Sequence, residues 1–201
     1  MARCIVFCAG GFQGLDKPLL PDDYIIAADG GFSHVQPLGC KPDHIIGDFD
    51  SLGFVPEGAQ VFPIEKDDTD AMLAVRHGLS LGFKEFVFYG ALEGERLDHT
   101  ISNYQTLLYL ASHGAHGTLV GEKQSVTTVS DIMEFPAGIC GTLSVFAMGG
   151  TARGVTLKGL KYNAEDITLT PDFPLGVSNH FMGNTASISV KEGTLLVVYP
   201  T

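Results

Sequence analysis

The first 120 or so residues alternate short apolar runs with segments in which apolar residues recur every three or four positions. Five apolar runs end at glycine, aspartate or proline, as strands that close on a turn commonly do. They span residues 3–11, 24–31, 43–50, 59–65 and 85–91. Because the runs are nearly continuous in apolar residues, they predict strands buried on both faces, as in a mostly parallel sheet.

Two of the intervening segments, residues 69–81 and 98–113, have a helical period. The apolar positions that carry this period are Ala71, Val75, Leu79, Ile101, Tyr104, Leu108 and Ala111. Helices that alternate with parallel strands cover both faces of the sheet. The pattern therefore predicts an α/β domain of three layers.

After about residue 121 no helical period persists, and short stretches of alternating polarity follow, separated by glycine-rich turns. Such stretches are typical of antiparallel strands. They span residues 125–130, 141–148, 152–160, 186–193 and 194–200. We therefore expect an α/β domain in residues 1–124 and an all-β domain, a sandwich or a barrel, in residues 125–201.

Composition narrows the class of protein. The chain is 45% hydrophobic and 17% charged, which is typical of a soluble globular protein. No apolar stretch approaches the roughly 18 residues of a membrane helix, so we expect no membrane partner and a cytoplasmic location. A net charge of −11 argues against nucleic-acid binding, which needs a basic surface. The four cysteines lack metal-ligand spacing, and Cys4 and Cys8 are expected to be buried thiols.

Aspartates follow the ends of several predicted strands, where ligands bind in an open parallel sheet. These residues are Asp29, Asp48, Asp50, Asp67, Asp68, Asp70 and Asp98. If the chain stays extended after the third strand, Asp48 and Asp50 point to the same side and repel each other unless a cation lies between them. Oxygen ligands without a His/Cys group indicate a hard cation, either Mg²⁺ or Ca²⁺. Of the two, Mg²⁺ commonly binds together with the phosphates of a nucleotide.

Each acidic segment also has a structural interpretation. Asp68 is well placed to cap the helix that follows it, and residues 29–31 could be a simple turn that requires glycine. In the β domain, Ser178, Asn179 and His180 could form a hairpin turn, or they could line a pocket for a polar heterocycle with Phe181 or a neighbouring side chain as a flat wall.

The segment from Gly90 to Asn103 combines glycines, a basic residue and a helix start. Gly90 and Gly94 permit close approach of the backbone, and Arg96 carries a planar group suited to phosphate. Asp98 opens a helix whose N-terminus can attract an anion. The alternative is a loop with a capped helix and a solvated arginine. The common phosphate-binding and hydrolase motifs are absent from the sequence.

Taken together, five segments resemble the thiamine pyrophosphokinase (thiamin diphosphokinase) family: ADGG, PDHIIGDFDS, KDDTDAMLA, GALEGERLDHTISN and GVSNHF. Their order and spacing match across nearly the whole chain. The resemblance implies transfer of the terminal diphosphate of ATP to the hydroxyethyl group of thiamine, which gives thiamine diphosphate and AMP. It also implies a homodimer that holds thiamine between the α/β domain of one chain and the β domain of the other.

The resemblance further implies roles for individual residues. Mg²⁺ would be held by Asp48 and Asp50, with Asp29 and Asp70 completing the metal site. Asp48, Asp50, Asp70 and Asp98 would be catalytic, and either Asp70 or Asp98 would accept the proton of the thiamine hydroxyl. Substrate-binding roles are implied for Asp29, Thr69, Arg96, Asn103, Ser178, Asn179 and His180.

Two other functions fit the same residues. One is a different Mg²⁺-dependent phosphohydrolase, which would use the carboxylates on another phosphate ester. The other is a non-catalytic sensor of nucleotide or thiamine. Against the sensor, so many carboxylates would repel a phosphate ligand unless a metal ion were bound.

Overall fold

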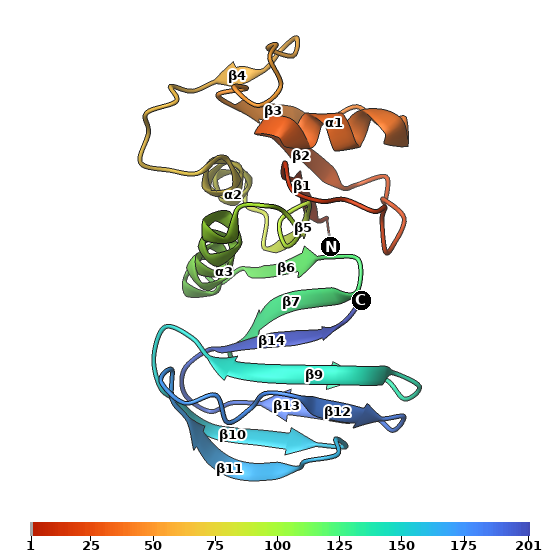
Figure 1. Ribbon diagram of the computed structural model, residues 1–201, viewed down its shortest axis with the longest axis vertical. Coiled ribbons are helices and arrows are strands. Elements are labelled where there is room, and N and C mark those ends of the chain that lie inside the picture. Colours follow the sequence, from red (N-terminus) through yellow and green to blue (C-terminus); the bar gives the residue numbers. More distant parts are fainter. Residues whose placement is uncertain (1) are drawn as a thin grey trace. The chain divides into compact units, whose positions relative to one another are not determined.

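The computed structural model describes residues 2–201, which form two compact units (Figure 1). The first unit ends at Glu122 and the second is Lys123–Thr201. In the first unit the strands pair in parallel in the order β6-β5-β1-β2-β3-β4. The strands are β1 (Cys4–Phe7), β2 (Tyr24–Ala28), β3 (His44–Gly47), β4 (Gln60–Val61), β5 (Glu85–Tyr89) and β6 (His116–Val120). Each of the five predicted runs contains one of β1 to β5, so the parallel sheet is confirmed.

Both predicted helices are present, as α2 (Asp70–Ser80) and α3 (Leu97–Ser112). The start of α2 differs from the expectation, because the residue that caps it is Thr69 and not Asp68. The Thr69 hydroxyl accepts the backbone N–H of Met72 at 3.2 Å. Asp68 instead pairs with Arg76 at 3.4 Å. A short helix, α1 (Phe32–Val35), was not predicted, since one turn is too short to show a period.

Helices cover the two faces of the parallel sheet, because successive side chains of a strand point to opposite faces. On one face Gly78 of α2 lies against Cys4 of β1 and Phe86 of β5, where any side chain at Gly78 would clash. On the other face Ile5 and Phe7 share a buried cluster with Val35 of α1. Cys4 and Cys8 are both buried, as expected. The sheet is thus the middle of three layers, which leaves its strand ends free to carry a site.

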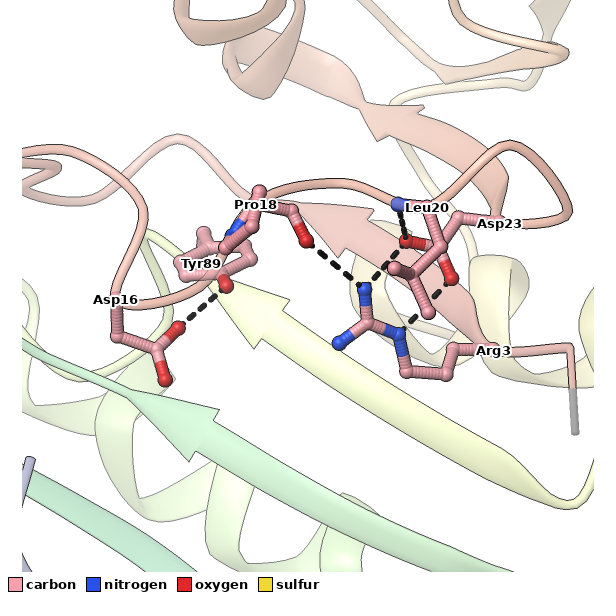
Figure 2. Close-up of polar contacts among 6 residues, drawn as sticks. All are labelled: Arg3, Asp16, Pro18, Leu20, Asp23 and Tyr89. Carbon is pink, nitrogen blue, oxygen red and sulfur yellow. Dashed lines mark hydrogen bonds and ion pairs between the residues drawn. The ribbon is translucent and has the colours of Figure 1, made fainter.

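Two polar anchors hold the long connection between β1 and β2 in place (Figure 2). Arg3 Nε donates to Asp23 Oδ1 at 2.9 Å and its terminal nitrogen to Oδ2 at 2.5 Å, while the Asp23 side chain is only 1% exposed. The Leu20 backbone N–H donates to the same carboxylate at 2.8 Å. Nearer to β1, Asp16 of the connection accepts a hydrogen bond from the Tyr89 hydroxyl at the end of β5, at 2.6 Å. These contacts fix the connection that starts at the site described below.

The second unit is an antiparallel sandwich, which confirms the prediction of an all-β domain. One group of strands has the order β12-β9-β14-β7 and the other β11-β10-β13-β8. Buried side chains from both, among them Val145, Val197, Val155 and Ile188, pack in one core. The strands are β7 (Gln124–Val129), β8 (Ile132–Phe135), β9 (Cys140–Ala147), β10 (Ala152–Lys158), β11 (Ala164–Leu169), β12 (Asn179–Met182), β13 (Ala186–Ser189) and β14 (Leu195–Pro200).

Within residues 2–201, no helix has the combination of length and apolar character that crossing a bilayer requires.

Candidate active site

A cavity of about 870 Å³ lies in the first unit, where the strands β1, β2, β3 and β5 end. Its wall comes from the residues that directly follow these strands, from the segment before α2 and from the first turns of α3. The aspartates that line it are Asp29, Asp48, Asp50, Asp68 and Asp70. Side chains far apart in the sequence therefore meet here because parallel strands deliver their carboxyl ends to one edge.

Three of these carboxylates form a compact group. One ligand atom each from Asp29, Asp48 and Asp50 lies within 4.8 Å of the others. Ser51 Oγ donates to Asp29 Oδ2 at 2.6 Å, but Asp29 Oδ1 is buried and accepts no hydrogen bond from residues 2–201. A buried carboxylate oxygen without a partner is unfavourable. The group therefore has the donor set and the unused oxygen that a hard divalent cation requires.

The two aspartates after β3 come together by a turn and not along an extended strand. β3 ends at Gly47, and Phe49, which is buried, has a φ of 59° in the left-handed region. The Asp50 backbone N–H then donates to Asp48 Oδ1 at 3.3 Å. Asp29 also has a positive φ, of 48°. Such values are uncommon outside glycine and concentrate at functional sites.

Lys66 supplies the positive charge beside these carboxylates, a role that the sequence analysis did not assign. Its Nζ lies 2.5 Å from Asp48 Oδ2 and 3.0 Å from Asp70 Oδ1, and its side chain is only 13% exposed. The hydrogen bond from Lys66 holds the pKa of Asp48 below its ordinary value. The i, i+4 spacing of Lys66 and Asp70 was visible in the sequence, but the contact with Asp48 was not.

Asp70 and Asp98, the two expected proton acceptors, lie in different surroundings. Burial raises the pKa of Asp70 above its ordinary value despite the nearby Lys66. Asp98 is 64% exposed, and hydrogen bonds from Arg96 at 2.6 and 3.0 Å lower its pKa to about 2. Arg96 lines the cavity, whereas Asp98 is not among the lining residues of the described chain. The structure thus brings Asp70, but not Asp98, to the carboxylate group.

Several predicted contact residues have partners within the protein. The Asn103 side chain is buried and donates to the Ala91 carbonyl at 2.7 Å, which holds the loop after β5 against α3. Gly90 has a φ of 67°, and a Cβ there would lie 2.3 Å from the Cys8 carbonyl oxygen. This glycine therefore allows two loops of the protein to pack together. Gly94, by contrast, meets only an ordinary contact.

In the second unit, Ser178, Asn179 and His180 surround the start of β12. Ser178 is exposed with a φ of 62°, and its backbone N–H donates to Ser144 Oγ at 3.0 Å. The buried Asn179 side chain bonds both the N–H and the carbonyl of Tyr162, at 3.0 and 2.7 Å. His180 is half-buried. Asn179 thus fixes the loop around Tyr162, whereas Ser178 is exposed.

Phe181 does not form the expected wall of a pocket. It is 6% exposed and packs edge-on against Phe135 in the core, with ring centroids 4.9 Å apart. The alternation along β12 explains the difference, because Phe181 shares its buried face with Asn179.

The fold of the chain is similar to that of solved thiamine pyrophosphokinases. The enzyme from Bacillus subtilis has a TM-score of 0.84 and 23% identity, over 100% of this chain and 99% of that one. The enzyme from Geobacillus thermodenitrificans has a TM-score of 0.80 and 24% identity, over 100% and 98%. Thiamin pyrophosphokinase from Candida albicans has a TM-score of 0.77 and 14% identity, over 99% and 89%. No curated protein matches the chain in sequence.

Two family models match the chain and together cover most of it. The catalytic domain of thiamin pyrophosphokinase matches residues 16–119, which include the whole carboxylate group. The vitamin B1 binding domain of thiamin pyrophosphokinase matches residues 124–195. The chain therefore belongs to the thiamin pyrophosphokinase family, and its activity is that of a thiamine diphosphokinase.

Proposed function

We propose that the cavity of the first unit is where the diphosphate of ATP is transferred to thiamine, with Mg²⁺ held by Asp29, Asp48 and Asp50. The proposal depends on one observation, the three carboxylates within 4.8 Å of one another. The unpartnered oxygen of Asp29 supports it, since a bound cation would satisfy that atom. Bound Mg²⁺ would neutralise charge on the transferred diphosphate and on the leaving AMP.

The reaction needs one proton acceptor, and we assign this role to Asp70. The thiamine hydroxyl attacks the β-phosphorus, its O–H proton leaves, and the bond from the β-phosphorus to the bridging oxygen of AMP breaks. Asp70 lines the cavity, and its raised pKa makes it a better acceptor than Asp98. Asp98 is tied to Arg96, and its low pKa makes it a poor base. Arg96 remains suited to the phosphates, because its guanidinium is exposed beside the cavity.

Thiamine is a cation, so an acidic cavity favours its binding. We propose that Ser178 contacts the thiamine pyrimidine and that Asn179 acts by holding the loop around Tyr162. This part of the second unit also carries exposed apolar side chains, and the contact of a large apolar patch with water is unfavourable. These side chains are Tyr162, Phe173, Leu175, Val177 and Met182. Their exposure supports the homodimer that the family resemblance implies. The cytoplasmic location expected from the sequence remains a prediction.

The test is AMP release with ATP, Mg²⁺ and thiamine, measured for Asp50→Asn and for a matched control. We expect Asp50→Asn to lower turnover at least about a hundredfold, because one ligand of the cation that offsets charge in the transition state is lost. Asp22→Asn, an exposed residue of the same unit, should keep wild-type turnover. Near-normal turnover of Asp50→Asn would contradict the metal assignment.

The same assay separates the other two functions. Phosphate release without thiamine would indicate a phosphohydrolase. Tight binding of nucleotide and thiamine in calorimetry, without any AMP, would indicate a sensor.

A further inference from the structure

Lys66 occupies one of the carboxylates that the proposed metal site assigns to the cation. Its ammonium lies 2.5 Å from Asp48 Oδ2 and 3.0 Å from Asp70 Oδ1. Asp48 is also one of the three carboxylates grouped for a cation, and its other oxygen accepts the Asp50 N–H at 3.3 Å. Both oxygens of Asp48 therefore already have partners. A divalent ion that binds Asp48 must compete with the ammonium for the same carboxylate.

The charges in the cavity decide where the Lys66 ammonium is most stable with and without a bound cation. Asp29, Asp48, Asp50 and Asp70 line one cavity, and Lys66 is paired with two of them. The ammonium thus offsets repulsion among the carboxylates when no cation is bound. A divalent cation bound to Asp48 would be repelled by this nearby ammonium.

The lysine side chain can relieve that repulsion by moving. Its four-carbon stem is flexible, and its ammonium is a compact point charge that binds phosphate well. Lys66 lines the same cavity as Arg96 and the loop after β5, where the proposed site holds the nucleotide phosphates. A shift from Asp48 toward those phosphates would keep the ammonium paired.

We propose that Lys66 is a positioning residue that holds Asp48 and Asp70 in the metal-free protein, competes with the divalent cation, and turns to the nucleotide phosphates once the cation binds. This inference rests on the proposed function, because it takes the carboxylate group as the metal site. It makes Lys66 an intrinsic competitor of the metal and a ligand of the nucleotide, so that metal binds tightly only together with its nucleotide.

The experiment measures Mn²⁺ binding by calorimetry for Lys66→Met, Lys66→Arg and the control Lys41→Met. Lys41 is exposed before the start of β3, at the strand end opposite to Asp48. For Mn²⁺ alone, we expect Lys66→Met to bind about tenfold more tightly than wild type, because the competing charge is gone. Lys66→Arg keeps the charge and should bind as wild type does, as should Lys41→Met.

A second titration uses an ATP analogue with a methylene bridge between the α- and β-phosphates, in saturating Mn²⁺. Here Lys66→Met should bind about tenfold more weakly, since a charged phosphate contact is lost. Without metal, its Tm should fall below that of wild type and recover when Mn²⁺ is added. A lysine that served only to hold the fold would not make Mn²⁺ binding tighter.

The outcomes separate the two proposals. If Lys66→Met binds Mn²⁺ as wild type does, or more weakly, the competition is refuted. If it binds the nucleotide analogue as tightly as wild type, the movement to the phosphates is refuted. If Asp50→Asn leaves Mn²⁺ binding unchanged, the metal site of the proposed function is wrong, and the inference on Lys66 falls with it.

Discussion

Gly47 controls how closely two of the grouped aspartates approach each other, and Gly47→Ala tests that control. Gly47 ends β3 with a φ of 157°, a value that residues with a side chain rarely adopt. A Cβ at this position would lie 3.0 Å from both Asp29 Cα and Asp29 N, and 3.1 Å from Asp29 Cβ. Ordinary carbon contacts are about 3.5–4.0 Å, so the Asp29 backbone would have to move by roughly half an ångström.

Two costs add up in this variant. Overpacking of this kind costs about 1–3 kcal/mol, and a side chain at an unfavourable φ costs about 1 kcal/mol or more. Together the two costs are about 2–4 kcal/mol. At about 2–4 °C per kcal/mol for a chain of this size, we expect the Tm to fall by roughly 4–16 °C. The same movement separates Asp29 from Asp48 and Asp50, so the affinity for Mg²⁺ should fall at least about tenfold, since Mg²⁺ requires near-ideal octahedral geometry.

The assay combines thermal unfolding without metal with calorimetry for Mg²⁺ and for Ca²⁺. Ca²⁺ accepts longer and more variable ligand distances, so its affinity should fall less than that of Mg²⁺. Gly58→Ala is the matched control, because Gly58 also has a positive φ, of 78°, but has no atom within 4 Å of an added Cβ. A Gly47→Ala protein with wild-type Tm and wild-type Mg²⁺ affinity would refute the reasoning.

Two further predictions concern the anchor of the β1–β2 connection and the second unit. Burial alone would raise the pKa of Asp23, but hydrogen bonds from Arg3 and Leu20 outweigh it and lower the pKa. The stability from this contact is therefore present above about pH 4 and is lost as the pH falls through the lower pKa of the folded state. Asp23→Asn should lower the free energy of unfolding by about 1.5–3 kcal/mol at pH 7. Urea unfolding should show that this difference from wild type becomes smaller below about pH 4. A difference that stays constant with pH would argue against the ion pair. In steady-state kinetics, Ser178→Ala should raise the KM for thiamine about three- to tenfold with little change in kcat, as expected for one lost hydrogen bond. An unchanged KM would show that Ser178 does not belong to the thiamine site.

The sequence by itself determined the elements and the region of the site. Apolar period and turn residues are local signals, so they located β1 to β5, α2, α3 and five antiparallel strands of the second unit, which are β7, β9, β10, β13 and β14. They did not locate β6, β8, β11 and β12. Topology then required Asp29, Asp48 and Asp70 to approach one edge, because parallel strands deliver their carboxyl ends together.

Only the tertiary structure decided which of these side chains interact. The turn at Phe49, the contact of Lys66 with Asp48, and the exposure of Asp98 depend on atoms that are distant along the chain. The buried partners of Asn103 and Asn179 likewise appear only once the loops are packed. Residue spacing limits which side chains can share an edge or a face. The orientation of each side chain, and so its charge partner, depends on packing, because burial makes an unpaired polar group costly.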